Sequence, residues 1–378
     1  MRSKLPQNKL SIFAVMSKMA AQYNAINLSQ GFPDFNTDPK LIDLVTQAMR
    51  NGANQYAPLA GHLPLRENIA ALVQDLRGAA YDPEQEICVT VGASEALFVA
   101  ITAFVHREDE VIVLKPAYDT YEPTIELQGG IPVPVQLDAP YTKVDWDAVA
   151  AAITPKTRML ILNNPHNPSG MVLKDADLKR LEELVKDTDI LILSDEVYEH
   201  IIFDAQQHRS VASYPGLKER ALVTASFGKT FHTTGWKMGY CLAPKALMAE
   251  FNKVHQNTVF CVHHPTQVAL AEYLKEPKHY LDLGSFYQQK RDVFLNAIKD
   301  SRFQFKPSEG TYFQMLDYSA ISDLNDVAFA EYLTQEKGLA SIPVSVFNKD
   351  NRDDQLLRFC FAKNEDTLLQ AAAILNSL

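Results

Sequence analysis

Two short apolar segments flank a helical repeat in residues 158–195, which read RMLILNNPHNPSGMVLKDADLKRLEELVKDTDILILSD. The segments at 158–163 and 190–194 have the length and apolar content of buried strands. Residues 175–186 between them repeat apolar side chains at helical spacing. A strand, a helix and a second strand in this order predict a βαβ unit, in which the two strands run parallel.

Five further segments have the strand pattern and extend this unit along the chain. They cover residues 86–91, 110–115, 131–137, 221–226 and 237–243. The first of them leads into Gly92, after which apolar residues recur at helical spacing, so this region predicts a strand, a turn and a helix. The alternation predicts an α/β fold: a mostly parallel sheet flanked by helices on both faces, with its ligand site at the carboxyl ends of the strands.

The pattern changes after about residue 251, where the helical stretches become longer. Helices are expected at 266–275, 280–300, 326–335 and 365–378, and strands at 312–316 and 356–361. This mixture predicts a second, smaller α+β domain.

The composition excludes several classes of protein. The 378 residues include 36 Lys plus Arg and 46 Asp plus Glu, a formal charge of −10 that disfavours nucleic acid as a partner. No apolar run approaches the roughly 18 residues of a membrane helix. The apolar patch at 12–16 is too short for a secretory signal, so we expect a cytoplasmic protein that does not span a membrane.

The cysteines and histidines do not predict a metal site. The four cysteines are widely separated, which is typical of reduced core thiols, and no pair has metal-ligand spacing. His263 and His264 are adjacent, a spacing at which two side chains cannot easily face one ion. We therefore expect no bound metal.

Three motifs for other chemistries fail when their partner residues are checked. Residues 92–95 (GASE) lack the G-x-G-x-x-G of a dinucleotide site. Residues 228–230 (GKT) look like the end of a P-loop, but Val223 stands where the first glycine would be. Residues 226–229 (SFGK) fit S-x-x-K of penicillin-recognising enzymes, yet neither S-D-N nor K-T-G accompanies them.

Polar residues follow three consecutive predicted strands where each strand ends. Residues 164–170 (NPHNPSG) follow one strand, 194–198 (SDEVY) end the next, and 226–229 (SFGK) end the third, with 235–240 (GWKMGY) soon after. Because the carboxyl ends of parallel strands meet at one edge of a sheet, we expect these residues to converge on one cleft.

These segments, in this order, resemble the fold-type-I aminotransferases that use pyridoxal 5′-phosphate. The resemblance extends from residues 31–34 (GFPD) to 357–359 (LRF), and residues 229–237 and 342–347 are most similar to the branch of kynurenine, glutamine and methionine aminotransferases. It implies a seven-stranded type of sheet. It also implies an N-terminal arm and part of the small domain at 1–35, a large cofactor-binding domain at 36–265 and a small C-terminal domain at 266–378.

The resemblance assigns the central chemistry to Lys229, whose amine would form a Schiff base with the cofactor aldehyde and then move a proton at the substrate Cα. A surface lysine is the alternative. Asp195 matches the carboxylate that keeps the pyridine nitrogen protonated, although an aspartate here could instead cap the following turn. Asn167 and Tyr198 match donors to the phenolic oxygen of the ring, and an Asn before Pro168 is also ordinary turn chemistry.

A phosphate group is held by backbone amides at a helix start, by hydroxyl donors and by a cation. Many family members have an arginine at the position of Lys237, and a lysine supplies a point charge rather than a two-pronged fork. The resemblance assigns these roles to Gly92, Ala93, Ser94, Ser226 and Lys237.

The resemblance also implies where the ring and the substrate bind. Tyr118 corresponds to the aromatic residue that stacks on the ring, with core packing as the alternative. Arg358 matches the clamp for the substrate carboxylate, with a structural ion pair as the alternative. Gly31 and Asn167 are further substrate-binding candidates. Tyr56 resembles the tyrosine that reaches the phosphate of a neighbouring subunit, which implies a homodimer.

We therefore predict an aminotransferase that moves the amino group of methionine, or of an aromatic, glutamine- or kynurenine-type amino acid, to a 2-oxo acid by a ping-pong reaction. A carbon-sulfur β-lyase on the same scaffold is the alternative. A non-catalytic sensing domain of this fold is disfavoured because no basic winged-helix pattern is found.

Overall fold

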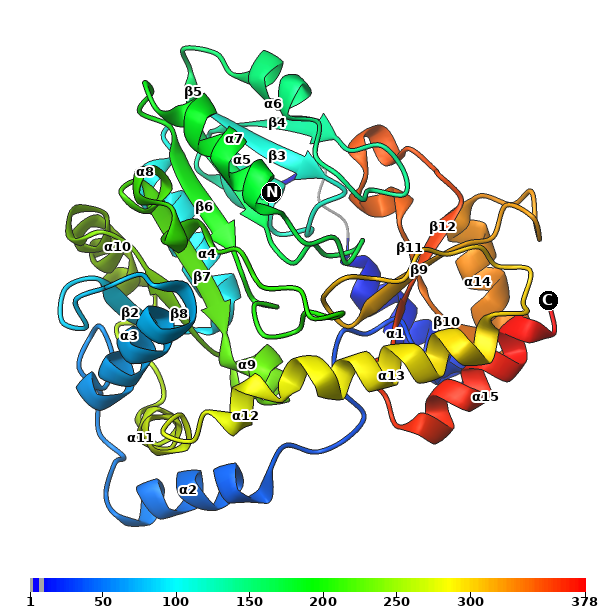
Figure 1. Ribbon diagram of the computed structural model, residues 1–378, viewed down its shortest axis with the longest axis horizontal. Helices are drawn as coiled ribbons and strands as arrows, with labels where there is room; N and C mark the ends of the chain where they lie inside the picture. Colours follow the sequence, from blue (N-terminus) through cyan, green and yellow to red (C-terminus); the bar gives the residue numbers. More distant parts are fainter. Residues whose placement is uncertain (1–2, 7–9) are drawn as a thin grey trace.

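In the computed structural model, which describes residues 3–6 and 10–378, a seven-stranded sheet lies at the centre of the larger part of the molecule (Figure 1). The strands from β7 to β4 are parallel to one another, and β8 is antiparallel to both of its neighbours. The predicted α/β fold with a mostly parallel sheet is confirmed. The order across the sheet is β2 (Ile87–Val91), β8 (Met238–Leu242), β7 (Ala221–Ser226), β6 (Leu191–Asp195), β5 (Thr157–Asn163), β3 (Glu110–Lys115) and β4 (Ile131–Gln136).

The direction of β8 follows from a short connection. Between the end of β7 and the start of β8, residues 227–237 form only the one-turn helix α9 (Phe227–Thr230) and the 3₁₀ turn η2 (Thr234–Trp236). A parallel neighbour needs a crossover of about a dozen residues or more, so the chain turns back beside β7 instead. This turn places Lys229 and Lys237 at the same edge of the sheet.

Alternating side chains of the strands form two apolar layers, one on each face of the sheet. Val111 and Val113 of β3 pack with helices α4 (Gly92–Phe104), α5 (Tyr121–Leu127) and α10 (Lys245–Thr258). Ile112 and Leu114 belong to the opposite layer. The helices of that layer are α3 (Leu63–Arg77), α6 (Trp146–Ala152), α7 (Asp175–Val185), α8 (Pro215–Lys218) and α11 (His264–Tyr273), and α2 (Pro39–Arg50) packs on α11.

A smaller part combines the C-terminal residues with the first helix and strand of the chain. Its antiparallel sheet has the order β11 (Ile342–Pro343), β12 (Leu356–Cys360) and β9 (Phe313–Asp317), and β1 (Ile26–Asn27) pairs with β10 (Leu339–Ala340). One apolar cluster joins these strands to α1 (Ile12–Gln22), α13 (Leu283–Ile298), α14 (Asp326–Glu336) and α15 (Glu365–Asn376). Helix α13 runs from the larger part to the C-terminal helices (Figure 1).

The structure corrects two predicted helices. The helix expected at 280–300 is interrupted at Asp282, so that α12 (Lys278–Leu281) is separate from α13. The helix expected from residue 266 begins at His264, because Pro265 fits the first turn, where its missing N–H has no intrahelical partner. The predicted domain boundaries stay a prediction, and residues 1, 2 and 7–9 of the predicted N-terminal arm lie outside the described residues.

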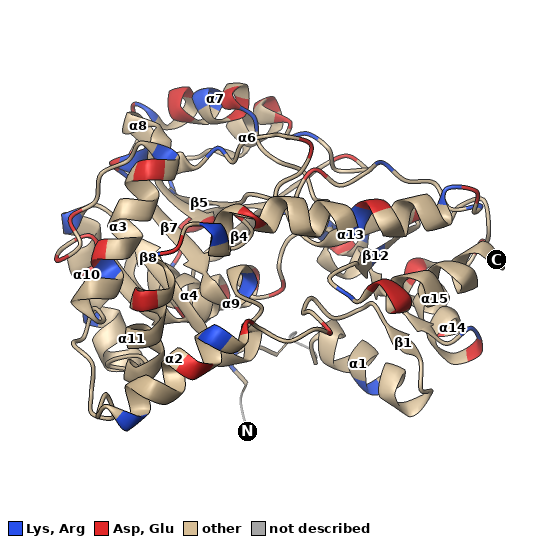
Figure 2. Ribbon diagram, turned by 60° about the horizontal axis from the view of Figure 1, so that its bottom comes forward, with Lys and Arg blue, Asp and Glu red and all other residues tan. Residues whose placement is uncertain are grey.

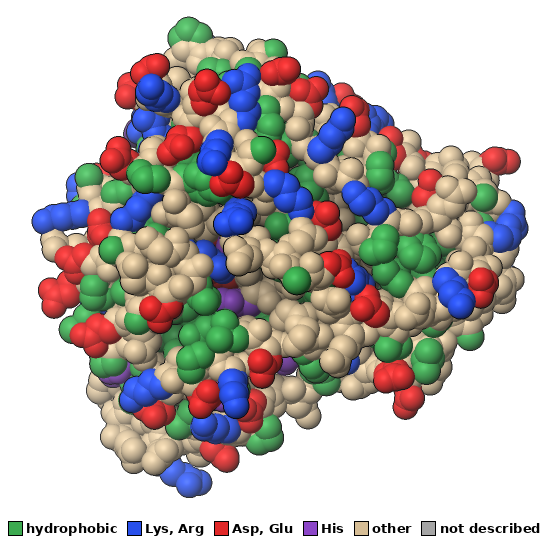
Figure 3. Space-filling view, viewed as in Figure 1, with side chains coloured by type: hydrophobic (Ala, Val, Ile, Leu, Met, Phe, Trp, Pro, Cys, Tyr) green, Lys and Arg blue, Asp and Glu red, His purple; other side chains and the backbone are tan. Residues whose placement is uncertain are grey.

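Acidic and basic residues alternate along the outer helices (Figure 2), and their side chains are interspersed over the face of the molecule in Figure 3. Among the helices of residues 3–6 and 10–378, none combines the length and the apolar character needed to cross a membrane. The four cysteines are free thiols, and Cys88, Cys241 and Cys360 are buried.

Candidate active site

A cavity of about 290 Å³ opens where the carboxyl ends of β5, β6 and β7 meet the smaller part of the molecule. With the exception of Tyr56, every residue that the sequence analysis selected lines this cavity. They are Gly31, Gly92, Ala93, Ser94, Tyr118, Asn167, Asp195, Tyr198, Ser226, Lys229, Lys237 and Arg358.

Lys229 lies in the one-turn helix that follows β7, and its amine points into the cavity. Its Nζ is 5.7 Å from the ring centre of Tyr198 and 5.6 Å from that of Tyr312, and 3.4 Å from the carbonyl oxygen of Gly31. Burial lowers the pKa of this amine to about 8, and the positive charges of Lys237 and Arg358 act in the same direction. In the described chain no carboxylate lies within ion-pair distance of Nζ, so the amine is enclosed and unpaired rather than at the surface.

Asp195 is the last residue of β6 and is buried at the cavity. The hydroxyl of Tyr121 donates to its Oδ2 at 2.6 Å, and the backbone N–H of Val197 donates to its Oδ1 at 3.4 Å. The second contact is the turn interaction that was the alternative to a cofactor role for Asp195. Burial raises the pKa of Asp195 to about 6, against the opposing effects of the Tyr121 hydrogen bond and the Lys229 charge.

Asn167 links the loop after β5 to β12. Its Oδ1 accepts from Nη1 of Arg358 at 2.8 Å, and its backbone N–H donates to Oδ1 of Asn163 at 2.7 Å.

The side chain of Tyr198 packs edge-on against Tyr312, with ring centres 5.2 Å apart. Burial raises the pKa of Tyr198, so its hydroxyl keeps its proton as a donor.

His166 anchors the loop that carries Asn167. Its Nε2 is 3.0 Å from the carbonyl oxygen of Pro116, and its Nδ1 is 2.7 Å from the hydroxyl of Ser169. Because a carbonyl oxygen only accepts, Nε2 must carry the proton and Nδ1 must accept from Ser169. Burial lowers the pKa of His166 to about 4, which keeps the ring neutral in this role. The loop after β5 is thereby tied to the loop that carries Tyr118.

The end of the cavity at the start of α4 has the features of an anion site. Helix α4 begins at Gly92, whose φ of +67° is in the left-handed region that favours glycine. A Cβ on Gly92 would lie 3.4 Å from both Cε and Nζ of Lys237, which shows how closely this cation approaches the helix start. Gly239 permits this packing, because a Cβ there would lie 2.8 Å from the backbone nitrogen of Ala93.

Arg358 lies in the middle of β12 and is 1% exposed. Its Nη1 and Nη2 donate to Oδ1 of Asn167 and to the carbonyl oxygen of Ser29 at 2.8 and 3.1 Å, and its Nε has no partner. The guanidinium stacks on Phe313 at 3.9 Å from the ring centre. In the described chain no carboxylate pairs with Arg358, so the structural ion pair that was its alternative is absent.

Gly31 and Tyr56 occupy different surroundings. A Cβ on Gly31 would lie 2.8 Å from the ring of Phe313, so a larger residue would collide with the wall of the cavity. Tyr56 is 82% exposed and stacks edge-on against Phe260, beside a surface depression that also includes His263 and His264. The structure therefore does not bring Tyr56 to the cavity of its own chain.

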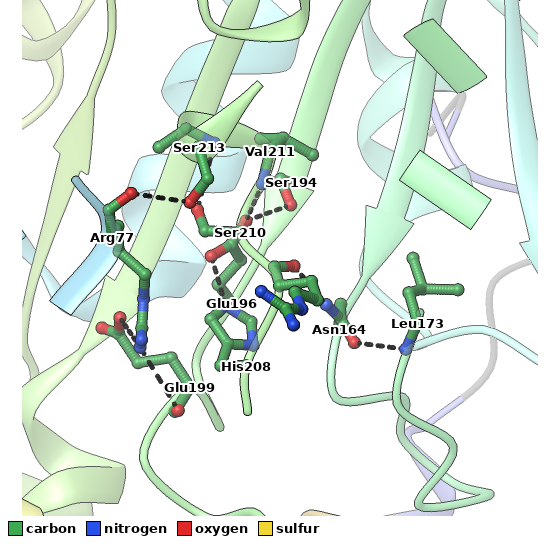
Figure 4. A network of polar contacts seen from close by, with 12 residues as sticks. Arg77, Asn164, Leu173, Ser194, Glu196, Glu199, His208, Ser210, Val211 and Ser213 are labelled. Atoms are coloured by element: carbon green, nitrogen blue, oxygen red, sulfur yellow. Dashed lines mark hydrogen bonds and ion pairs between the residues drawn. The ribbon is translucent and has the colours of Figure 1, made fainter. Parts of the chain in front are cut away.

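A buried polar network lies at the end of β6 and around the residues that follow it (Figure 4). Glu196 accepts from Nε2 of His208 at 2.6 Å and from the hydroxyl of Ser194 at 2.8 Å. Glu199 accepts from Arg77 at 3.2 Å. Glu196 comes directly after Asp195, and Glu199 directly after Tyr198. The two glutamates do not line the cavity, so the network anchors the segment that presents Asp195 and Tyr198 to it.

Several cavity residues were not selected from the sequence. Phe13 and Gln30 come from the N-terminal segment, and Phe313 comes from β9, so only tertiary packing brings them to the cavity. Tyr121 lies three residues after Tyr118 and meets Asp195 from 74 positions away. Its position at a helical spacing from Tyr118 was the one available signal.

Among the described residues, no group of three or more His, Cys, Asp or Glu side chains is arranged to hold a metal ion.

Comparisons with known proteins give concordant matches over almost the whole chain. The family described as aminotransferase class I and II matches residues 23–375. The methionine aminotransferase of Escherichia coli (strain K12) is 51% identical over 378 residues, which are 100% of this chain and 98% of that protein. Kynurenine–oxoglutarate transaminase 1 of Mus musculus is 36% identical, over 93% of this chain and 91% of that protein. A crystal structure of YbdL from Escherichia coli, described as a methionine aminotransferase, superposes with a TM-score of 0.98, covering 100% of this chain and 99% of that one.

Proposed function

Because this chain belongs to the class I and II aminotransferases, we propose that it binds pyridoxal 5′-phosphate and transfers the amino group of methionine, or of an aromatic, glutamine- or kynurenine-type amino acid, to a 2-oxo acid. One observation carries the proposal: Lys229 and Arg358 line the same cavity, and neither has a carboxylate partner in the described chain. A buried cation without a partner is unfavourable unless a ligand supplies the missing group.

The residues of the cavity fit this cofactor. The start of α4 with Lys237 beside Gly92 suits a phosphate, and Asp195 suits a protonated ring nitrogen. Asn167 uses its Oδ1 on Arg358, which leaves its Nδ2 free to donate to the ring oxygen together with the hydroxyl of Tyr198. When bound, the cofactor supplies an aldehyde that takes up the amino group and a ring that withdraws electrons from the substrate Cα.

The protein side chains perform the proton transfer and the orientation. Arg358 binds the α-carboxylate that amino-acid and oxo-acid substrates share, so one group serves both half-reactions. Lys229 would take a proton from the substrate Cα as a general base in the half-reaction that forms the oxo acid, and would supply a proton to Cα as a general acid in the reverse half-reaction. Its pKa of about 8 lies near a physiological pH, which suits a group that must both accept and donate.

The walls of the cavity favour an uncharged substrate side chain. Phe13, Tyr118, Met238 and Phe313 contribute apolar surface, and among the described lining residues Arg358 is the single arginine. A substrate with a second carboxylate would have no second arginine fork to bind it. Methionine, the substrate named for the relative that is 51% identical, matches this surface.

The remaining assignments extend the same proposal. Tyr56 is exposed and would reach the phosphate in the cavity of a second subunit, so the active unit would be a homodimer. The division at residue 35 is supported by the apolar cluster that α1 shares with α13, α14 and α15. The division at residue 265 has no such support, because α11 packs in the apolar layer of the seven-stranded sheet. A cytoplasmic location remains a prediction from the sequence.

The test is an absorption spectrum of the purified protein with added pyridoxal 5′-phosphate. We expect a visible band that disappears on addition of methionine and returns on addition of a 2-oxo acid. Lys229→Ala should lose the band and nearly all turnover. Lys290→Ala is the matched control, because Lys290 is also partly buried among aromatic rings but lies outside the cavity. Pyruvate and a thiol formed from cystathionine without transamination would establish the β-lyase instead.

A further inference from the structure

We propose that Tyr121 is a positioning residue of this site. Its hydroxyl donates a hydrogen bond to one oxygen of Asp195 and so favours the charged carboxylate, and its ring orients Tyr118. The inference rests on the proposed cofactor, because Asp195 and Tyr118 are the two groups that would contact the cofactor ring from different sides.

The position of Tyr121 allows it to act on both neighbours. It is the first residue of α5 and is buried, at 2% exposure. Its hydroxyl donates to Oδ2 of Asp195 at 2.6 Å, and its ring meets that of Tyr118 edge-on, at 5.8 Å between centres and an angle of 80°. Among the described residues, Oδ1 of Asp195 receives only the 3.4 Å contact from Val197. The carboxylate is therefore fixed through one oxygen and keeps the other available to a ligand.

The charges around Asp195 give the Tyr121 hydroxyl an electrostatic consequence. The titratable groups that act on the carboxylate are Tyr121 from α5, Lys229 from α9, and Glu196 and Tyr198 from its own segment. Burial raises the pKa of Asp195, and Glu196 adds to that rise, whereas Tyr121 and Lys229 oppose it. When Lys229 is engaged with a ligand, its charge is no longer available, and the Tyr121 hydrogen bond becomes the main protein contact that favours the carboxylate.

Tyr121 remains a donor over the working range of pH. Burial and the neighbouring charge of Asp195 raise its pKa well above the usual value, so the hydroxyl does not ionise. Its removal should raise the pKa of Asp195 by roughly one to two pH units, the effect of a single hydrogen bond to a charged group. A protonated Asp195 cannot hold a protonated pyridine nitrogen, so the loss should appear as a weaker affinity for the ring at low pH.

Tyr121→Phe removes the hydroxyl and keeps the ring against Tyr118. Tyr240→Phe is the matched control, because Tyr240 is also buried and donates to a buried carboxylate, Glu199, at 2.9 Å, but does not line the cavity. The probe is pyridoxamine 5′-phosphate, which carries the same ring and phosphate but no aldehyde to react with Lys229. Its dissociation constant is measured by calorimetry on the cofactor-free proteins between pH 6 and pH 9.

For Tyr121→Phe we expect a dissociation constant roughly 5 to 50 times that of the wild type at pH 6, converging on the wild-type value at pH 9. Tyr240→Phe should follow the wild type at every pH. A Tyr121→Phe curve that coincides with the wild type, or one that is weaker by the same factor at all pH values, would overturn the inference. Failure of the wild type and the control to bind the probe would instead refute the proposed function.

A second measurement does not depend on the folding of Tyr121→Phe. In cofactor-free wild-type protein labelled with ¹³C at Asp Cγ and Tyr Cζ, the resonances of Asp195 and Tyr121 should titrate with a common midpoint near pH 6. A Tyr121 resonance that does not respond to the titration of Asp195 would overturn the inference without any variant.

Discussion

Replacing Arg358 by lysine keeps a positive charge in the cavity but removes the planar fork. The wild-type guanidinium has five N–H donors, and two of them are used inside the protein, on Asn167 and on the carbonyl oxygen of Ser29. Three donors, including the unpartnered Nε, remain for a substrate carboxylate. A lysine at this position has three donors in all and cannot bind a carboxylate through two parallel hydrogen bonds while also holding the two internal acceptors.

The size of the effect follows from this difference. Two hydrogen bonds to a charged group contribute about 3–6 kcal/mol, and a lysine that retains the charge recovers part of this. A net loss of about 3–4 kcal/mol corresponds to a decrease in kcat/KM of roughly 100- to 1000-fold. Because the carboxylate is bound in both the ground state and the transition state, most of the loss should appear as a higher KM.

The assay is steady-state transamination with methionine as the donor, together with the spectrum of the bound cofactor, which should not change. Arg66→Lys is the matched control, because Arg66 is also buried and donates to backbone carbonyls at 3.1 Å (Gly61) and 2.5 Å (Pro83), outside the cavity. A loss of less than ten-fold for Arg358→Lys, or one no larger than that of the control, would refute a carboxylate clamp.

Three further predictions concern the cofactor end of the cavity. Gly239→Ala should lower the free energy of unfolding by about 1–3 kcal/mol in thermal denaturation, because its Cβ would lie 2.6 Å from the carbonyl oxygen of Ala225; an unchanged melting temperature would contradict this packing. Lys237→Ala should weaken cofactor binding by roughly ten-fold, and the affinity of the variant should no longer depend on salt; equilibrium dialysis at two ionic strengths measures both. Burial lowers the pKa of Lys229 to about 8, so between about pH 8 and pH 10.5 the unfolded chain binds more protons than the folded one and the folded state gains stability as the pH rises. Cofactor-free Lys229→Met should therefore be more stable than the wild type at pH 7, and urea denaturation should show this advantage shrinking towards pH 10; a constant difference would contradict the lowered pKa.

The local elements were predictable because their signals are local. The apolar runs and helical repeats of residues 158–195 predicted β5, α7 and β6. The observed bounds differ from the predicted ones by one residue at one end of β5 and of α7, and by one residue at both ends of β6. The predicted family, α/β fold and aminotransferase activity are confirmed. The interruption at Asp282 was not predictable, because residues 280–300 keep their apolar repeat across it and no proline or glycine stands at the break.

The partners of each cavity residue depended on contacts that the sequence does not encode locally. Asn167 and Arg358 are 191 positions apart, and only the packing of β12 beside the loop after β5 decides that they share a hydrogen bond. The same packing decides that Arg358 meets no carboxylate partner in residues 3–6 and 10–378. Tyr56 marks the opposite case, since it is 82% exposed and the role proposed for it requires a second subunit.

The sequence by itself determined the types of residue that stand at the strand ends, because strand periodicity and the order of the motifs are properties of neighbouring residues. The tertiary structure alone decided that Lys229 and Arg358 have no carboxylate partner among the described residues and that Tyr121 reaches Asp195. Those outcomes depend on distances between residues far apart in the chain, and burial, hydrogen bonding and charge set the chemistry of a side chain only once those distances are known.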